Sequence, residues 1–110
     1  MNVDRTHGDA LLALLSALAN PQRMRVVAAL SRGRSHVSGL ARDVGMSRPL
    51  LYLHLQKLEA AGIVRGSLEL SDDGKAMKYF ELVPFDVHIT PQVVVQAAES
   101  LSAATSDKED

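Results

Sequence analysis

The residues best suited to contact another macromolecule lie close together near the middle of the chain. Arg48 and Gln56 flank Tyr52 and Leu53 in this segment. Arginine can donate two hydrogen bonds to guanine, glutamine can pair with adenine, and apolar side chains can contact the methyl group of thymine. This combination of residue types predicts that the segment reads base edges in a DNA groove.

Charge is divided unevenly along the 110 residues, although the net charge is only −1. The stretch from Pro21 to Arg65 holds eight basic and two acidic residues, a net charge of +6, and the remainder carries −7. Phosphate contacts require positive charge and hydrogen-bond donors. The predicted DNA-binding residues are Arg42, Ser47, Arg48, Pro49, Tyr52, Leu53, Gln56, Lys57, Arg65, Lys75 and Lys78.

The composition excludes several other classes of function. The chain has no cysteine, so it can form neither disulfides nor thiolate metal sites. It has no glycine-rich phosphate loop, no nucleophile elbow and no clustered acid–base pair, so we expect no catalytic residues and no enzyme. No apolar run is long enough for a membrane span, and the N-terminus lacks an apolar signal core. We therefore expect a cytoplasmic protein.

Apolar periodicity predicts a mainly α-helical fold with one β-hairpin. The predicted helices cover residues 10–19, 22–30, 37–44, 48–61 and 91–104, and the predicted strands cover 63–69 and 75–83. In the fourth helix Leu51, Leu55 and Leu58 form a core stripe, which points the predicted base-reading residues outward. In the second helix we expect Met24, Val27, Ala28 and Leu30 to be buried. In the fifth helix Val94, Ala97, Ala98 and Leu101 form an apolar stripe.

The order of the elements predicts a winged helix-turn-helix. A short helix joined through a tight turn at Gly45 to a longer helix is the helix-turn-helix motif, and the hairpin that follows is the wing. We expect one such domain over residues 9–104. A flexible N-terminus over 1–8 and a disordered acidic tail over 105–110 are expected to flank it.

The sequence resembles the ArsR/SmtB family of winged helix-turn-helix regulators. Leu18, Asn20-Pro21 and Arg23 are similar to that family's Leu-x-x-Pro-x-Arg pattern before the second helix. The stretch from Ser47 through His54 and Leu55 to Leu58 is similar to its recognition helix, and Ala61-Gly62-Ile63-Val64 to its junction with the wing. Gly74 and Tyr79-Phe80-Glu81-Leu82 fit its wing, so the resemblance covers roughly residues 10–104.

The resemblance implies a sequence-specific DNA-binding transcription regulator. Family members form homodimers through the first and last helices, and the apolar stripes of those helices suit such an interface. A twofold dimer would place two recognition helices about 34 Å apart on a palindromic operator. The sequence departs from expectation at Asp72-Asp73, because an acidic wing tip would be repelled by phosphate.

The resemblance also raises the question of a metal sensor. One family pattern has Asp-x-His, ten residues, a His, two residues and then Glu or His. Here Asp86 and His88 match, Glu99 takes the place of the second histidine, and Ser102 is a poor ligand. Nitrogen and oxygen donors suit nickel(II) or zinc(II), and the thiol-free pattern resembles nickel-linked members of the family. Other candidate ligands are Asp4, His7, Asp9 and His36, whereas His54 is expected to be a packing residue.

An alternative hypothesis is a winged-helix module that binds another protein. The acidic wing tip and the exposed pair Leu50 and Leu53 motivate it. In that case a co-regulator protein would supply the sensing.

Overall fold

The computed structural model describes residues 8–102, and the predictions for residues 1–7 and 103–110 lie outside this part of the chain. Five helices and three short strands follow one another along it. They are α1 (Gly8–Leu18), α2 (Pro21–Leu30), β1 (Ser35–His36), α3 (Val37–Val44), α4 (Arg48–Ala60), β2 (Val64–Leu70), β3 (Ala76–Leu82) and α5 (Pro91–Glu99). The prediction of five helices and a β-hairpin wing is confirmed.

Three helices begin at the same local signal, which is a polar capping residue followed by a proline in the first turn. The side chains of Asn20, Ser47 and Thr90 each accept a hydrogen bond from the backbone N–H three residues later, at 3.0, 3.4 and 3.1 Å. Proline suits this position because it needs no backbone donor there. These signals fix where α2, α4 and α5 begin.

A left-handed glycine makes the tight turn of the helix-turn-helix. Gly45 ends α3 with a φ of 69°, which is the conformation that glycine adopts without steric cost. The N–H of Met46 donates to the carbonyl of Ala41 at 3.1 Å and closes the turn. Only three residues, 45–47, separate α3 from α4, so the two helices must pack at an angle to each other.

The wing belongs to a three-stranded antiparallel sheet of order β1-β3-β2. β2 and β3 pair along their whole length, from Val64 opposite Leu82 to Leu70 opposite Ala76. β1, in which Ser35 pairs with Phe80 and His36 with Tyr79, was not predicted from the sequence. Two residues are too few to show an alternating pattern, so only the pairing reveals this strand.

The core lies between α1–α4 and the base of the wing. Its fully buried side chains include Leu14, Val26, Leu40, Leu51, Leu55, Leu58, Ile63 and Phe80. The buried set predicted for α2 was right for Leu30 and wrong for Met24 and Ala28, which are exposed; Val26 and Ala29 are buried instead. The face of α2 that packs against the core is therefore shifted by about one residue from the predicted stripe.

The helix α5 ends at Glu99, five residues before the predicted end at 104. Ser100 closes the helix, since its backbone N–H donates to Ala97 at 3.1 Å. Of the four residues in the predicted apolar stripe of this last helix, only Ala97 is buried in one chain. Most of the apolar face of α5 is therefore exposed in a single chain.

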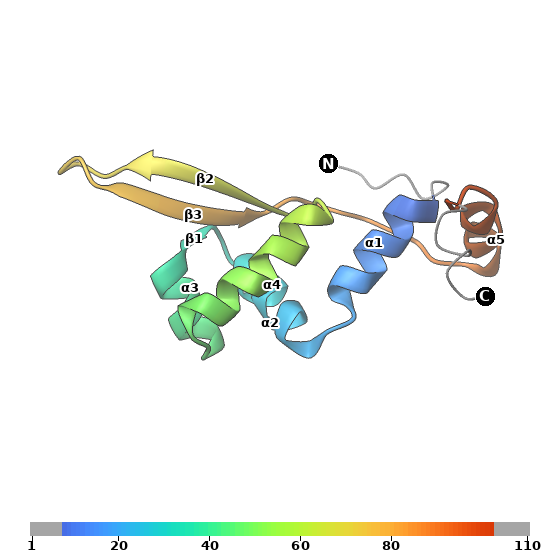
Figure 1. The fold of residues 1–110 in the computed structure, drawn as a ribbon, viewed down its shortest axis with the longest axis horizontal. Coiled ribbons are helices and arrows are strands. Elements are labelled where there is room, and N and C mark those ends of the chain that lie inside the picture. The colour runs from blue at the N-terminus through green and yellow to red at the C-terminus, as the bar shows by residue number, and fades with distance from the viewer. Residues whose placement is uncertain (1–7, 103–110) are drawn as a thin grey trace.

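The chain is elongated, and its two ends differ in kind (Figure 1). The β2–β3 wing projects at one end, whereas α5 packs beside the N-terminal end of α1 at the other. α3 and α4 lie under the base of the wing. No helix in the described part of the chain is long and apolar enough to cross a membrane.

Candidate nucleic-acid interface

The orientation of α4 is fixed by three leucines. Leu51, Leu55 and Leu58 are completely or almost completely buried, as the predicted core stripe requires. Leu53, on the opposite side, is 59% exposed, and Tyr52 is partly exposed with its ring edge-on to Phe80. The helix therefore presents a fixed outward face that is partly apolar and partly polar.

Polar residues at the start of α4 are held in place by α3 and by the helix cap. The guanidinium of Arg48 donates to the hydroxyl of Ser38 on α3 at 3.1 Å. Ser47 is engaged as the N-cap through its side chain, and Pro49 is exposed in the first turn. Ser38 was not predicted from the sequence, because nothing in the spacing of the two residues shows that α3 brings this hydroxyl beside Arg48.

The remaining predicted phosphate contacts lie in different surroundings. Arg42, in the last turn of α3, and Lys75, beside the wing tip, are exposed. The ammonium of Lys78 lies 5.7 Å from the centre of the Phe80 ring, and Arg65 forms an ion pair with Glu81 at 2.8 Å. Lys57 lines a cavity between α4 and α1. A phosphate would have to compete with Glu81 for Arg65, whereas Arg42 and Lys75 are exposed on the surface.

The wing tip is acidic and apolar. The hydroxyl of Ser71 donates to the carboxylate of Asp73, which lowers the pKa of Asp73 below its ordinary value and keeps it ionised. Leu68 and Leu70 on β2 are 69% and 76% exposed. This tip is poorly suited to phosphate, in agreement with the doubt raised by Asp72 and Asp73 in the sequence.

A second ionic contact fastens the middle of the wing to the body. The guanidinium of Arg34 forms two hydrogen bonds with the carboxylate of Glu69 and lies 4.3 Å from the centre of the Tyr79 ring. These hydrogen bonds lower the pKa of Glu69. This contact was not predicted from the sequence, in which Arg34 and Glu69 are 35 residues apart. The contact joins the segment before β1 to the outer end of β2.

Two histidines serve structural roles in the described chain. The Nδ1 atom of His36 accepts a hydrogen bond from the N–H of Gly39 at 3.3 Å and caps α3. His54 is half-buried on α4, and burial followed by the charge of Arg23 lowers its pKa. The expectation that His54 is a packing residue agrees with this placement.

The predicted metal ligands do not gather in one chain. Asp86 and His88 are exposed in the extended segment before α5, and Glu99 is the last residue of that helix. Asp9 instead accepts a hydrogen bond from the backbone N–H of Ser102 at 3.0 Å. Within residues 8–102, no three His, Asp or Glu side chains are close enough to share a metal ion. Asp4 and His7 lie outside the described residues.

An apolar groove of about 150 Å³ lies between α1 and α5, the two helices predicted to dimerise. It is lined by Gly8, Leu11, Leu12, Leu15, Val94, Ala97, Ala98 and Leu101. Leu12, Val94 and Val95 are each more than half exposed. Exposed side chains of this kind, side by side on two helices, indicate a surface for protein contact.

Comparison with known proteins gives a consistent family. Residues 20–65 match the model of the bacterial regulatory proteins of the arsR family. An uncharacterized HTH-type transcriptional regulator of Methanocaldococcus jannaschii is 30% identical over 84 residues, which are 76% of this chain and 87% of that protein. The nodulation protein NolR of Rhizobium meliloti is 42% identical over 60 residues, 53% of this chain and 49% of that protein.

Solved structures share the fold. NolR from Sinorhizobium fredii superposes with a TM-score of 0.57 at 28% identity, covering 84% of this chain and 82% of NolR. The homodimeric winged helix-turn-helix DNA-binding domain of a possible ArsR-family regulator from Mycobacterium bovis gives a TM-score of 0.61 at 22% identity, covering 92% and 82% of the two chains.

Proposed function

Because this chain belongs to the ArsR family of DNA-binding winged helix-turn-helix transcription regulators, which are not enzymes, we propose that it binds a palindromic operator as a homodimer. One observation carries the proposal. The buried stripe of α4 fixes the helix so that Arg48, Tyr52, Leu53 and Gln56 are all exposed. This is the set of residue types that reads guanine, thymine and adenine in the major groove.

The dimer is proposed to form through the α1–α5 groove. Its apolar side chains are exposed in a single chain, and a twofold axis through them would bury the same surface on both protomers. Two copies of α4 would then face successive turns of the major groove. The proposed phosphate contacts come from Arg42, Lys57, Lys75 and Lys78, with Arg65 available once it leaves Glu81.

A footprint on the promoter of its own gene tests this function. We expect protection of two inverted half-sites whose centres are about 10 base pairs apart, the spacing that a twofold dimer requires. Protection of a single half-site, or of no defined site, would contradict a dimer on a palindrome.

Control of DNA binding by a metal ion is a separate proposal, and a single chain does not hold the predicted ligands in one site. Asp86, His88 and Glu99 form no group of donors within the described residues, so any site that uses them must draw on a second protomer. Calorimetric titration of the dimer with nickel(II) and with zinc(II) tests the set. If two protomers share a site, His88→Ala should bind the metal ion more weakly than the wild type. Identical titrations of the wild type and His88→Ala would exclude this site.

The wing supports a second candidate function, which is binding of a co-regulator protein. Leu68 and Leu70 are the most exposed of the large apolar side chains in the described chain, and they lie next to the acidic tip. Such a surface suits a protein partner better than DNA. If this chain formed a stable complex with another protein and had no affinity for DNA, that result would favour this function over the first.

A further inference from the structure

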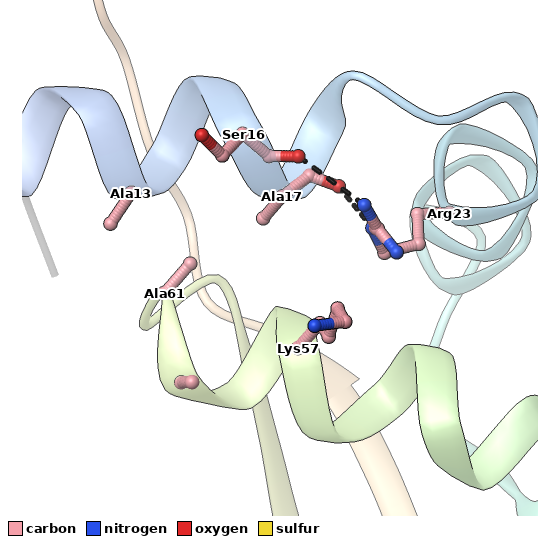
Figure 2. Close-up of a pocket in the computed structure, with 7 residues that line it drawn as sticks. Ala13, Ser16, Ala17, Arg23, Lys57 and Ala61 are labelled. Atoms are coloured by element: carbon pink, nitrogen blue, oxygen red, sulfur yellow. Dashed lines mark hydrogen bonds between the residues drawn. The ribbon is translucent and has the colours of Figure 1, made fainter. Parts of the chain in front are cut away.

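A cavity of about 290 Å³ lies between α1 and α4, on the flank of α4 away from the wing (Figure 2). Two cations and five small side chains line it. These residues are Ala13, Ser16, Ala17, Arg23, Lys57, Ala60 and Ala61. In Figure 2 the side chains of Ala13 on α1 and Ala61 at the end of α4 face each other across the cavity. Among residues 8–102, none that lines the cavity is acidic.

Arg23 is held rigidly at one wall. Its Nε donates to the carbonyl of Ala17 at 2.6 Å, and one terminal nitrogen donates to the carbonyl of Ser16 at 3.3 Å. These two bonds satisfy the C-terminal end of α1 and offset part of the positive charge. A guanidinium has five N–H donors, so further donors remain for another acceptor.

Lys57 supplies a second cation. Its ammonium has no hydrogen bond or ion pair with any described residue, and Figure 2 shows it in the gap between α4 and Arg23. The neighbouring carboxylate of Glu59 is turned to the wing, where it accepts a hydrogen bond from Gly66 N–H at 3.3 Å. Burial and then the charge of Arg23 lower the pKa of His54, and the second of these causes agrees with positive potential on this flank of α4.

We propose that this cavity binds a small aliphatic carboxylate. The carboxylate group would lie between Arg23 and Lys57, because a guanidinium and an ammonium both form strong charge-assisted hydrogen bonds to it. The short apolar body would lie against Ala13, Ala17 and Ala61, which offer contact surface but no hydrogen-bond donors. The volume is at the lower limit for small-molecule sites, which restricts the ligand to a compact one.

The site would couple ligand to DNA, an inference that rests on the proposed function. Arg23 binds to the end of α1, the helix assigned to the dimer, while Lys57 belongs to α4, the helix assigned to the groove. A carboxylate that engages Lys57 removes a cation predicted to contact phosphate. Ligand and operator therefore weaken each other's binding, and the effect is reciprocal by linkage.

Amide NMR of the full chain without DNA tests the site directly. Sodium chloride is replaced stepwise by sodium butyrate at constant ionic strength and pH, and butyramide serves as the uncharged probe of the same shape. We expect saturable shifts at the amides of Ala13, Ala17, Lys57 and Ala61 with butyrate only. Shifts that do not saturate, that occur equally with butyramide or that map elsewhere would overturn the proposal.

Two variants and a matched control sharpen the test. Lys57→Gln keeps most of the side-chain length and is expected to weaken butyrate binding about threefold to fivefold, whereas Lys75→Gln makes the same charge change on the wing and is expected to have no effect. Ala60→Leu, at an exposed helical position, is expected to narrow the cavity and reduce binding. Equal affinities for all four proteins would contradict the assigned site.

A measurement of operator binding in the presence of butyrate distinguishes failure of this inference from failure of the proposed function. Saturating butyrate is expected to weaken operator binding by the wild type more than butyramide does, and to have less effect on Lys57→Gln. NMR saturation without any DNA binding would refute the regulator function and leave the carboxylate site standing. DNA binding with no NMR saturation would refute the carboxylate site alone.

Discussion

Individual residues on α4 divide into those that hold the helix and those that it exposes. Leu51 and Leu55 anchor it, while Gln56 and Leu53 are free to contact a partner. The contact from Ser38 restricts Arg48, so the side chain expected to read guanine is already partly oriented. A restricted donor loses less conformational entropy on binding.

Base-reading and phosphate-contacting residues predict different responses to substitution. Gln56→Ala and Arg48→Ala are expected to cost about 1–3 kcal/mol on the operator and to relax its sequence preference, with little change on random DNA. Lys78→Ala should weaken binding to both DNAs by a similar factor and make it less sensitive to salt. Fluorescence anisotropy on both duplexes measures these effects. Equal losses on both DNAs from Gln56→Ala would remove it from base readout.

Protonation of His54 predicts a pH dependence of stability. Burial and the charge of Arg23 lower its pKa in the folded chain, so the unfolded chain binds more protons as the pH falls through about 6.5. The free energy of unfolding is therefore highest above that pH, where His54 is neutral in both states, and it decreases as the pH falls below it. Denaturant unfolding between pH 7.5 and 5.5 should show a smaller decrease for His54→Gln than for wild type. An exposed-site control, His88→Gln, should retain the wild-type decrease.

At the scale of the elements, local signals in the sequence located most of the fold. Asn20, Ser47 and Thr90 marked three helix starts, and Gly45 marked the tight turn. Prediction from the sequence failed where a contact between distant residues determines the local structure. β1 exists because β3 pairs with it, and the buried face of α2 depends on which neighbours Val26 meets rather than on periodicity.

The candidate site shows the same division. The exposed set on α4 followed from its leucine stripe, because helical geometry relates neighbouring side chains directly. The contact of Ser38 with Arg48 and the ion pair of Arg65 with Glu81 depend on tertiary packing and strand register. The sequence carries no local signal for either.

Close packing of α1 on α5 depends on a glycine. A Cβ at Gly8 would collide with the carbonyl oxygen of Ala97, so Gly8→Ala is expected to push the helices apart and destabilise the fold by about 1–3 kcal/mol. In contrast, Gly39→Ala in α3 adds only an ordinary contact 3.5 Å from His36 and is expected to be neutral or stabilising. Thermal unfolding compares the two variants. An unchanged Tm for Gly8→Ala would argue against the close α1–α5 contact.

At the scale of the whole molecule, the apolar α1–α5 groove, the α4 helix and the wing lie in three separate regions. α5 and the N-terminal end of α1 lie at one end, the wing at the other, and α4 between them (Figure 1). The first end carries the apolar groove, whereas the middle carries the basic stretch. Binding of two copies at the groove would bring two copies of α4 onto one DNA molecule.

Loss of the dimer is expected to cost most of the DNA affinity. Leu12→Glu places a charge in the α1–α5 groove and should give a monomer with operator binding weakened about a hundredfold, because one recognition helix then binds alone. Met24→Glu makes a similar change at an exposed position on α2 and should remain dimeric. Analytical ultracentrifugation and anisotropy check both properties. A dimeric Leu12→Glu would place the interface elsewhere.

The central claim is that the chain binds specific DNA through α4. The most direct test is the equilibrium affinity of the wild type for its operator and for a scrambled duplex at about 50 and 200 mM salt. We predict that the operator is bound at least about a thousandfold more tightly than the scrambled duplex, and that both affinities fall as salt rises. Equal affinities for the two duplexes, or binding indifferent to salt, would contradict the claim.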